Sequence, residues 1–474
     1  MTSSPLFDIF KHLTKQDRRA LKDFVQSPFH NKREDVVRLF DYMDTHYDNR
    51  RAPEADFWAK EQVFPAIHPD KTVYDDKEMR YTMSFLTKCI RQYLIYNELK
   101  NNELDSALKL NNALRTREAD KAYQKNLSDT YQQLDAQPLR HADFHLQKFQ
   151  LQLEDYTFHH QKQRSGAHHL QEISDSLTDF YVTELLRQAC VMHSHKSVSQ
   201  KSYNQLFLDV ILEKIESGAY PTPPSVFAYF YAYKALTNNT KLLDFQLLKK
   251  SILDDGHLFP ENEIRDLYLL AINFCIKKLN SGERDFGLEA LELYKNGLTN
   301  GVLLENKTLS RFTYNNVMKL ALKNNEFDWT EQFLNDFKKY LPARERENLY
   351  KYNLALFYFQ KRDYPKAMLL LQEVTLKDVL YNLDARRVLM RIYYELGEYT
   401  VLESFLESFT IFIRRQKELG YHRNNYLNLI KFVKKLLQTN LKLATEKQQL
   451  RVEIEQTTEL TEKDWLLTLV ADST

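Results

Sequence analysis

Apolar residues recur with the spacing of an α-helix along almost the whole chain, and the alternation of a half-buried β-strand is absent from the sequence. The first apolar stripe contains Leu6, Phe7, Phe10 and Leu13, and a long one lies within residues 77–99. Prolines and glycines interrupt this pattern at intervals that suit helical hairpins. We therefore predict an all-α fold of stacked antiparallel helical hairpins.

Glycine is scarce, with nine in 474 residues, and none precedes Gly166. Loops that cradle phosphate groups need glycine where the backbone turns tightly or touches the ligand. The sequence contains no G-x-G-x-x-G, no G-x-x-x-x-G-K and no G-x-S-x-G motif. These absences argue against dinucleotide-binding folds, P-loop NTPases and α/β-hydrolases.

Charge and cysteine content argue against further classes of function. The chain has 66 Lys and Arg against 65 Asp and Glu, a balance that argues against a general nucleic-acid coat. Cys89, Cys190 and Cys275 are far apart and form no C-x-x-C motif, so we expect no zinc ribbon, no disulfide framework and no cofactor. The start lacks the features of a signal peptide, and no apolar run approaches the ~20 residues of a membrane span. We expect a cytoplasmic protein that does not contact a membrane.

Four segments are predicted along the chain. Residues 1–100 form an N-terminal helical module, and residues 101–310 form helical hairpins of weak repeat character. Residues 311–410 carry clearer repeats, and residues 411–474 form C-terminal capping helices. No Ser/Gly-rich linker divides the chain, so one continuous helical body should follow the N-terminal module.

An internal repeat is clearest in two windows that align at a shift of 35 residues, 354–374 and 389–409. Every apolar position of one window matches an apolar position of the other. A fainter copy at 317–337 aligns with the middle window at a shift of 37. One hairpin cannot bury its apolar face alone, so neighbouring repeats should stack on one another.

The middle window resembles a tetratricopeptide repeat. The matching residues are Ala355, Tyr358, Asp363, Tyr364 and Ala367. The resemblance covers about residues 311–410 and implies a tetratricopeptide-like α-solenoid of degenerate form, since Met390 and Leu402 replace small residues. The turn at 27–32 and the segment 462–467 are also similar to uncharacterised bacterial helical-repeat proteins, a resemblance that implies no activity.

In tetratricopeptide proteins the first helix of each hairpin lines a concave groove. The resemblance assigns to it Phe312, Asn315, Lys319, Leu322, Leu349, Tyr352, Leu356, Phe359, Asp384, Arg387, Arg391 and Tyr394. Such a mixture suits a peptide with apolar anchors and a carboxylate. The alternative is that neighbouring helices fill the groove and make its apolar residues core. The leading hypothesis is a non-enzymatic scaffold that binds a protein or peptide partner there.

A second hypothesis is a helical ribonuclease. Residues 140–145 form an R-H-x-x-x-H string, which resembles the ribonuclease motif of the HEPN superfamily. The resemblance implies that Arg140 stabilises phosphate charge and that His145 moves protons. His141 and His145 also share a helix face at a spacing that metal sites use. A third metal ligand is lacking there, so we interpret them as solvated histidines and predict no metal site.

A third hypothesis rests on residues 412–437, which are locally basic and carry the aromatic residues Phe412, Tyr421, Tyr426 and Phe432. Basic residues interleaved with aromatic rings can bind single-stranded nucleic acid. The alternative is an amphipathic helix with a solvated basic face. Beyond it, residues 465–467 form a possible docking point onto the helical body.

Overall fold

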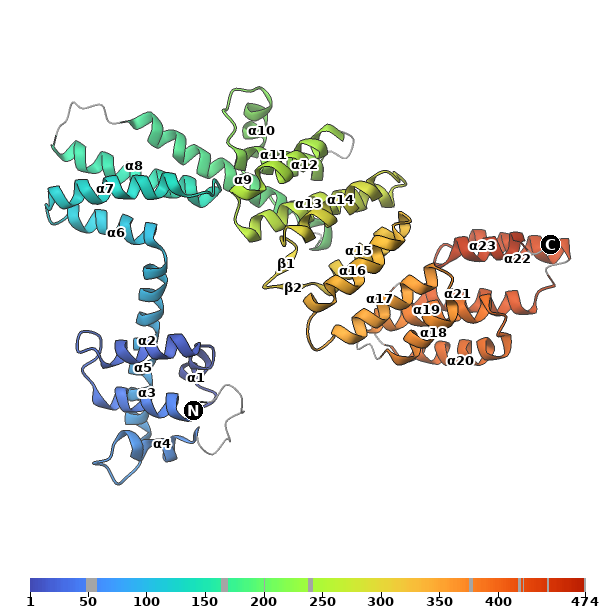
Figure 1. Cartoon of the computed structure of the whole chain (residues 1–474), viewed down its shortest axis with the longest axis horizontal. Coiled ribbons are helices and arrows are strands. Elements are labelled where there is room, and N and C mark those ends of the chain that lie inside the picture. The colour runs from blue at the N-terminus through green and yellow to red at the C-terminus, as the bar shows by residue number, and fades with distance from the viewer. Residues whose placement is uncertain are drawn as a thin grey trace. The chain divides into compact units, whose positions relative to one another are not determined.

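The computed structural model describes residues 1–47, 58–162, 169–199, 201–237, 242–374, 378–416, 419–420, 422–440 and 443–472. These residues are all-helical, as predicted, apart from one short β-hairpin (Figure 1). None of the helices in this part of the chain is long and apolar enough to cross a membrane.

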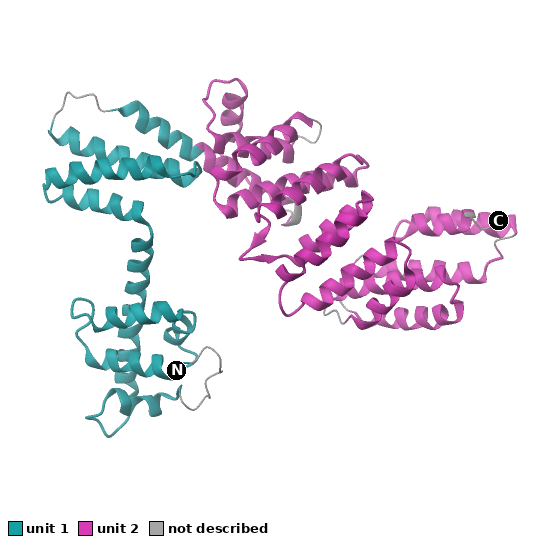
Figure 2. Cartoon of the chain, viewed as in Figure 1, with its two compact units in different colours: residues 1–181 teal, residues 182–474 magenta. Residues whose placement is uncertain are grey.

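The chain divides into two compact units, residues 1–181 and 182–474 (Figure 2). The boundary lies inside helix α9 (Leu170–Ser199), so it is not one of the boundaries predicted from the sequence. The helices of the first unit are α1 (Pro5–Phe10), α2 (Lys15–Gln26), α3 (Glu34–His46), α4 (Lys60–Ile67), α5 (Asp76–Asn101), α6 (Glu103–Arg115), α7 (Asp120–Ala136) and α8 (Ala142–Lys162).

The first five helices share one apolar core, in which α5 contacts each of the other four. Helix α2 begins at a capping box, where the Thr14 hydroxyl accepts from the backbone N–H of Asp17 and the Asp17 carboxylate accepts from the N–H of Thr14. It ends at Gln26, ahead of Pro28. Phe10, Phe40 and Trp58 are almost completely buried in this core.

Helices α6, α7 and α8 pack pairwise around a second, smaller core. Tyr123 of α7 stacks on Phe158 of α8 with ring centroids 4.0 Å apart. The Arg115 guanidinium of α6 reaches the Glu154 carboxylate of α8, with 2.6 Å between Nε and Oε1. One apolar stack and one charged pair therefore join the three helices.

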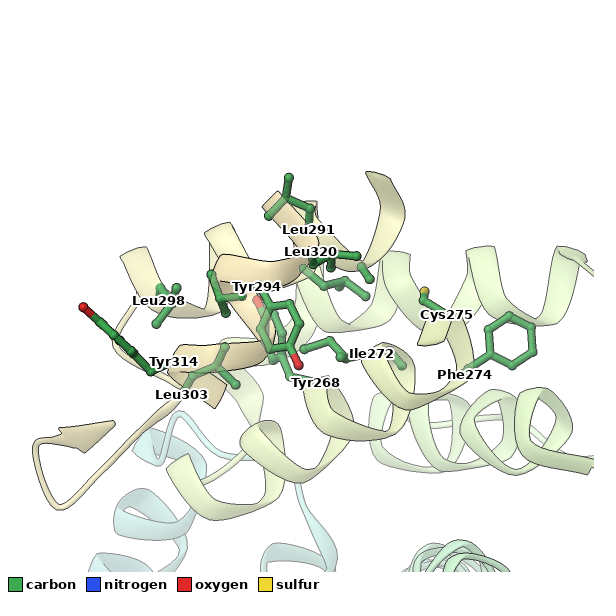
Figure 3. Close-up of a cluster of buried hydrophobic side chains, with 14 of the residues drawn as sticks. Tyr268, Ile272, Phe274, Cys275, Leu291, Tyr294, Leu298, Leu303, Tyr314 and Leu320 are labelled. Atoms are coloured by element: carbon green, nitrogen blue, oxygen red, sulfur yellow. The ribbon is translucent and has the colours of Figure 1, made fainter. Parts of the chain in front are cut away.

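The other helices of the second unit follow α9 along the chain. They are α10 (Leu208–Glu216), α11 (Pro224–Thr237), α12 (Leu242–Asp255), α13 (Glu261–Asn280), α14 (Phe286–Thr299), α15 (Arg311–Lys323), α16 (Phe327–Phe337), α17 (Arg346–Gln360), α18 (Tyr364–Glu373), α19 (Val379–Glu395), α20 (Tyr399–Arg415), α21 (His422–Gln438), α22 (Ala444–Gln456) and α23 (Lys463–Asp472). Figure 3 shows part of its core, where Tyr268 and Ile272 of α13 lie near Tyr294 of α14.

A β-hairpin that the sequence pattern did not predict connects α14 to α15. Its strands are β1 (Leu304–Glu305) and β2 (Thr308–Leu309), antiparallel with Leu304 opposite Leu309. Asn306 and Lys307 between them both have positive φ, 49° and 60°, as a two-residue turn of the primed type requires. Strands of two residues are too short to show an alternating pattern.

Three consecutive helical hairpins, α15–α16, α17–α18 and α19–α20, share one turn geometry. Asn325, Arg362 and Gly397 each adopt a left-handed backbone, with φ of 62°, 61° and 73°. Each time the next residue's N–H bonds back five residues, as from Asp363 to the Tyr358 carbonyl at 2.9 Å. These turns lie 37 and 35 residues apart, the shifts of the repeat found in the sequence. Helix α15 contacts α17, and α17 contacts α19, so the first helices of neighbouring hairpins pack together.

Candidate functional site

A charged network joins the first helices of the three hairpins at Asp384 of α19. Lys319 of α15 places its Nζ 3.5 Å from Oδ2 of Asp384, and the Tyr352 hydroxyl of α17 donates to the same oxygen. Arg387 donates to Oδ1 of Asp384 through Nε at 2.9 Å and Nη2 at 2.7 Å. Three residues assigned to the groove from the sequence thus contact the carboxylate of a fourth, Asp384. We call the groove-assigned side chains of α15, α17 and α19 the first-helix face.

The surroundings of Asp384 keep it ionised. Burial alone would raise the pKa of this carboxyl group. The charges of Arg387 and Lys319 and the hydroxyl of Tyr352 outweigh burial and hold the pKa at about 2. Burial and the neighbouring Asp384 carboxylate raise the pKa of Tyr352, so its hydroxyl stays protonated and acts as a donor. At neutral pH the network therefore holds a fixed negative charge within a cationic surround.

The two arginines of α19 also bind the C-terminal part of the chain. Arg387 and Arg391 donate from their Nη1 atoms to the two carboxylate oxygens of Glu462, with 2.7 Å between Nη1 of Arg391 and Oε2. Glu462 directly precedes α23 and has a left-handed backbone with φ of 59°. The Glu462 side chain is 16% exposed and that of Arg391 is 23% exposed. Each arginine thus contributes one donor to this carboxylate.

Aromatic rings complete the contact with α23. The Arg391 guanidinium carbon lies 5.0 Å from the ring centroid of Phe359 and 4.9 Å from that of Trp465, within the range of cation–π attraction. The Trp465 ring meets Tyr394 edge to face at 5.5 Å, and its indole N–H donates to Oε1 of Glu395 at 2.9 Å. Arg391 and Tyr394, both assigned to the groove, therefore contact a tryptophan from the same chain, and Phe359, also assigned to the groove, contacts Arg391.

Burial and the neighbouring charge of Arg387 lower the pKa of Arg391 to about 10. The guanidinium remains charged at neutral pH, as the contact with Glu462 requires. Its Nε has no hydrogen-bond partner in the described part of the chain. Arg391 therefore contacts one carboxylate oxygen and two aromatic rings, and its Nε–H group donates no hydrogen bond within the described residues.

The first-helix face is open at Phe312 and Lys319 of α15, whereas its other apolar side chains are buried or half-buried. Phe312 is 59% exposed, and Lys319 is about half exposed. Tyr352 and Leu356 of α17 are buried in the core, as are Leu322 and Leu349. Asn315 is partly buried, and its side-chain oxygen has no hydrogen-bond partner among the described residues.

Arg140 and His145 have different polar partners in the described structure. Arg140 donates to the backbone carbonyls of Asp135, Gln137 and Leu139, next to the end of α7, and its guanidinium lies 4.3 Å from the Phe144 ring centroid. His145 is buried, with Nδ1 3.6 Å from Oδ2 of Asp179.

Burial, with the cations nearby, lowers the pKa of His145 to about 4, so the ring is neutral at pH 7. His141 is also buried, which corrects the interpretation of both residues as solvated histidines. His141 directly precedes α8, and His145 lies in the first turn of that helix. Within the described ranges, no three His, Cys, Asp or Glu residues are grouped so that they could hold a metal ion.

The aromatic residues of 412–437 mostly face the core. Phe432 is 2% exposed, and Tyr426 is half-buried against Phe409. Phe412 lies under the Arg386 guanidinium, with 4.5 Å from its carbon to the ring centroid. Buried rings cannot stack on nucleic-acid bases. Lys417, Glu418 and Tyr421 lie outside the described residues.

The sequence pattern does not reveal Glu462, which is the contact partner of Arg387 and Arg391. Glu462 lies 71 residues after Arg391, and a separation of this kind leaves no periodic signal. The one available hint was the neighbouring Trp465, a large aromatic in a charged tail. Comparison with models of known protein families and with curated proteins yields no match to this chain.

Proposed function

We propose that residues 311–410 form a tetratricopeptide-like α-solenoid and that the protein is a non-enzymatic scaffold which binds a peptide segment of a partner protein on the first-helix face. The observation that carries this proposal is that side chains of α19 bind Glu462 and Trp465 of the same chain. A carboxylate and an apolar ring are the features expected of a peptide ligand for this mixture of side chains.

Two further features support the proposal. The contacts with Trp465 come from Arg391 and Tyr394 of α19, and Phe359 of α17 lies against the same Arg391 guanidinium. Phe312 and Lys319 of α15 remain accessible beside them. A partner peptide has both an exposed aromatic anchor and an exposed cation to contact there.

Peptides selected from a random display library on the immobilised full chain test this function. The variants Phe312→Ala and Lys319→Glu remove the open anchor and reverse the open charge. We expect the selected peptides to lose at least ten-fold in affinity on each variant.

Matched controls lie on α18, the second helix of its hairpin. Leu369 is 59% exposed, as Phe312 is, and Lys366 is an exposed lysine. The variants Leu369→Ala and Lys366→Glu should leave peptide affinity unchanged. Equal losses on both pairs, or a selection that yields no binding peptide, would contradict the proposed function.

A further inference from the structure

The first turn of α23 and the rest of that helix are held in different ways. Glu462 and Trp465 contact α19 through charge, one hydrogen bond and ring contacts, and Trp465 is also buried in the apolar core of the last helices. Leu466 and Val470, further along, are almost fully buried in a core shared with α21 and α22. Release of the first turn from the first-helix face therefore requires a ligand whose own aromatic ring takes the place of Trp465.

The backbone at Glu462 disfavours the bound arrangement. A left-handed backbone is unfavourable for a residue other than glycine, and Glu462 has φ of 59°. Its carboxylate is bound only because Arg387 and Arg391 offset that cost. An unstrained ligand with the same carboxylate would have an advantage at this position.

We propose that the partner of the first-helix face is a peptide carrying Glu or Asp and, three residues later, a tryptophan or another aromatic residue, and that it binds by replacing the first turn of α23. The inference rests on the proposed function and specifies its ligand. Glu462 directly precedes α23 and Trp465 lies in the first turn of that helix, and both side chains contact Arg391. The arginine pair binds the acidic residue, and the aromatic ring covers Arg391 opposite Phe359.

Competition with a tethered segment requires extra contacts, because tethering gives the internal segment an effective concentration in roughly the millimolar range. The open part of the face supplies them. A longer partner gains contacts with Phe312 and Lys319 of α15, the exposed residues of the same face. We therefore infer that α23 acts as a weak internal competitor that only a longer matching ligand displaces.

The test uses a fluorescent peptide with the sequence of residues 459–468 and the full chain in two forms. The opened form carries Glu462→Gln and Trp465→Ala, so its own segment no longer fills the site. Fluorescence anisotropy should show at least ten-fold tighter binding to the opened form than to the unmodified chain. Adding Arg391→Gln to the opened form should remove that gain. Helix content from circular dichroism, together with protection of α17 and α19 amides from hydrogen exchange, checks that the first-helix face of the opened form remains folded.

A control peptide with Gln and Ala at the positions of Glu462 and Trp465 should bind neither form. Equal binding of the probe to both forms, or equal binding of probe and control peptide, would overturn the inference. A dimer of the unmodified chain that disappears in the opened form would also overturn it, since the occupant would then be a second copy. The library selection on Phe312 and Lys319 is independent of this test. Library peptides that depend on α15 but lack the acidic–aromatic pair leave the proposed function standing and refute only this inference.

Discussion

Arg391 and Glu462 are 71 residues apart in the sequence and form an ion pair with 2.7 Å between Nη1 and Oε2. The pair connects α19 to the residue that precedes α23. Both side chains are largely withdrawn from water, so solvent screens their attraction less than it would on an open surface. The stability of the C-terminal helices should therefore depend on this contact.

Glu462→Gln should weaken that attachment. The substitution leaves Arg391 without a carboxylate partner in a partly buried position, at an expected cost of about 1–3 kcal/mol. Hydrogen exchange of the α23 amides should accelerate correspondingly. Glu455→Gln is the matched control, because Glu455 pairs with Arg451 in an exposed position and should change stability by no more than about 0.5 kcal/mol. Equal acceleration in both variants would show that the Glu462 contact contributes nothing special.

Opposite substitutions at two hairpin turns test whether the turns are equivalent positions of the repeat. Gly397 has φ of 73° and open space where a Cβ atom would lie, so Gly397→Ala should cost about 1 kcal/mol through the backbone alone. Arg362 occupies the same place in the preceding hairpin with φ of 61°, so Arg362→Gly should be neutral or stabilising. Urea denaturation followed by circular dichroism measures both. A loss of stability in both variants would mean that the two turns are not equivalent.

The helical architecture follows from local signals that are strong in this chain. The repeat at 354–374 and 389–409 leads to hairpins whose turns, at Arg362 and Gly397, share one geometry. The hairpin of β1 and β2 escaped prediction because strands of two residues show no alternation. The position of the turn depends on the left-handed backbone of Asn306 and Lys307, which lacks the glycine that usually marks such turns.

The candidate site was predictable in its parts and not in its assembly. Arg387, Arg391 and Phe359 were assigned to a groove by resemblance, and Trp465 was noted as a possible docking residue. Nothing in the sequence connects these two sets, because a contact between distant helices depends on how the intervening hairpins stack. The burial of Tyr352 and Leu356 likewise depends on packing between neighbouring first helices, which periodicity within one helix does not specify.

His145 should make the first unit less stable at mildly acidic pH. Its pKa is lowered to about 4 in the folded protein and is about 6.5 in an unfolded chain. The folded state therefore stays neutral while the unfolded state gains a proton, so stability is complete above pH 6.5 and declines as the pH falls towards 4. The loss should reach about 3 kcal/mol near pH 4, and His145→Gln should remove it.

His169 is the control for this pH dependence. It is exposed, and its hydrogen bond and ion pair with Glu172 raise its pKa, so any contribution is present at low pH and is lost as the pH rises. His169→Gln should leave the decline between pH 6.5 and 4 in place. Hydrogen exchange of α8 at several pH values measures both variants. An unchanged decline in His145→Gln would assign the pH dependence to other groups.

Tyr352→Phe tests whether Asp384 organises the first-helix face. The Tyr352 hydroxyl is buried and donates to an ionised carboxylate, and hydrogen bonds to charged groups contribute about 1.5–3 kcal/mol. The control is Tyr350→Phe on the same helix, since the Tyr350 hydroxyl donates to the neutral amide of Asn335 at 2.8 Å in an exposed position. We expect Tyr352→Phe to lower the free energy of unfolding by more than the control does.

The pKa of Asp384 is depressed to about 2, so its contribution is present above the unfolded value of about 3.9 and is lost as the pH falls towards 2. The difference between the two variants should thus be constant from pH 7 to about 4 in urea denaturation. If Asp384 is first replaced by Asn, the two tyrosine variants should become equal, and a difference that persists would assign the effect of Tyr352 to packing.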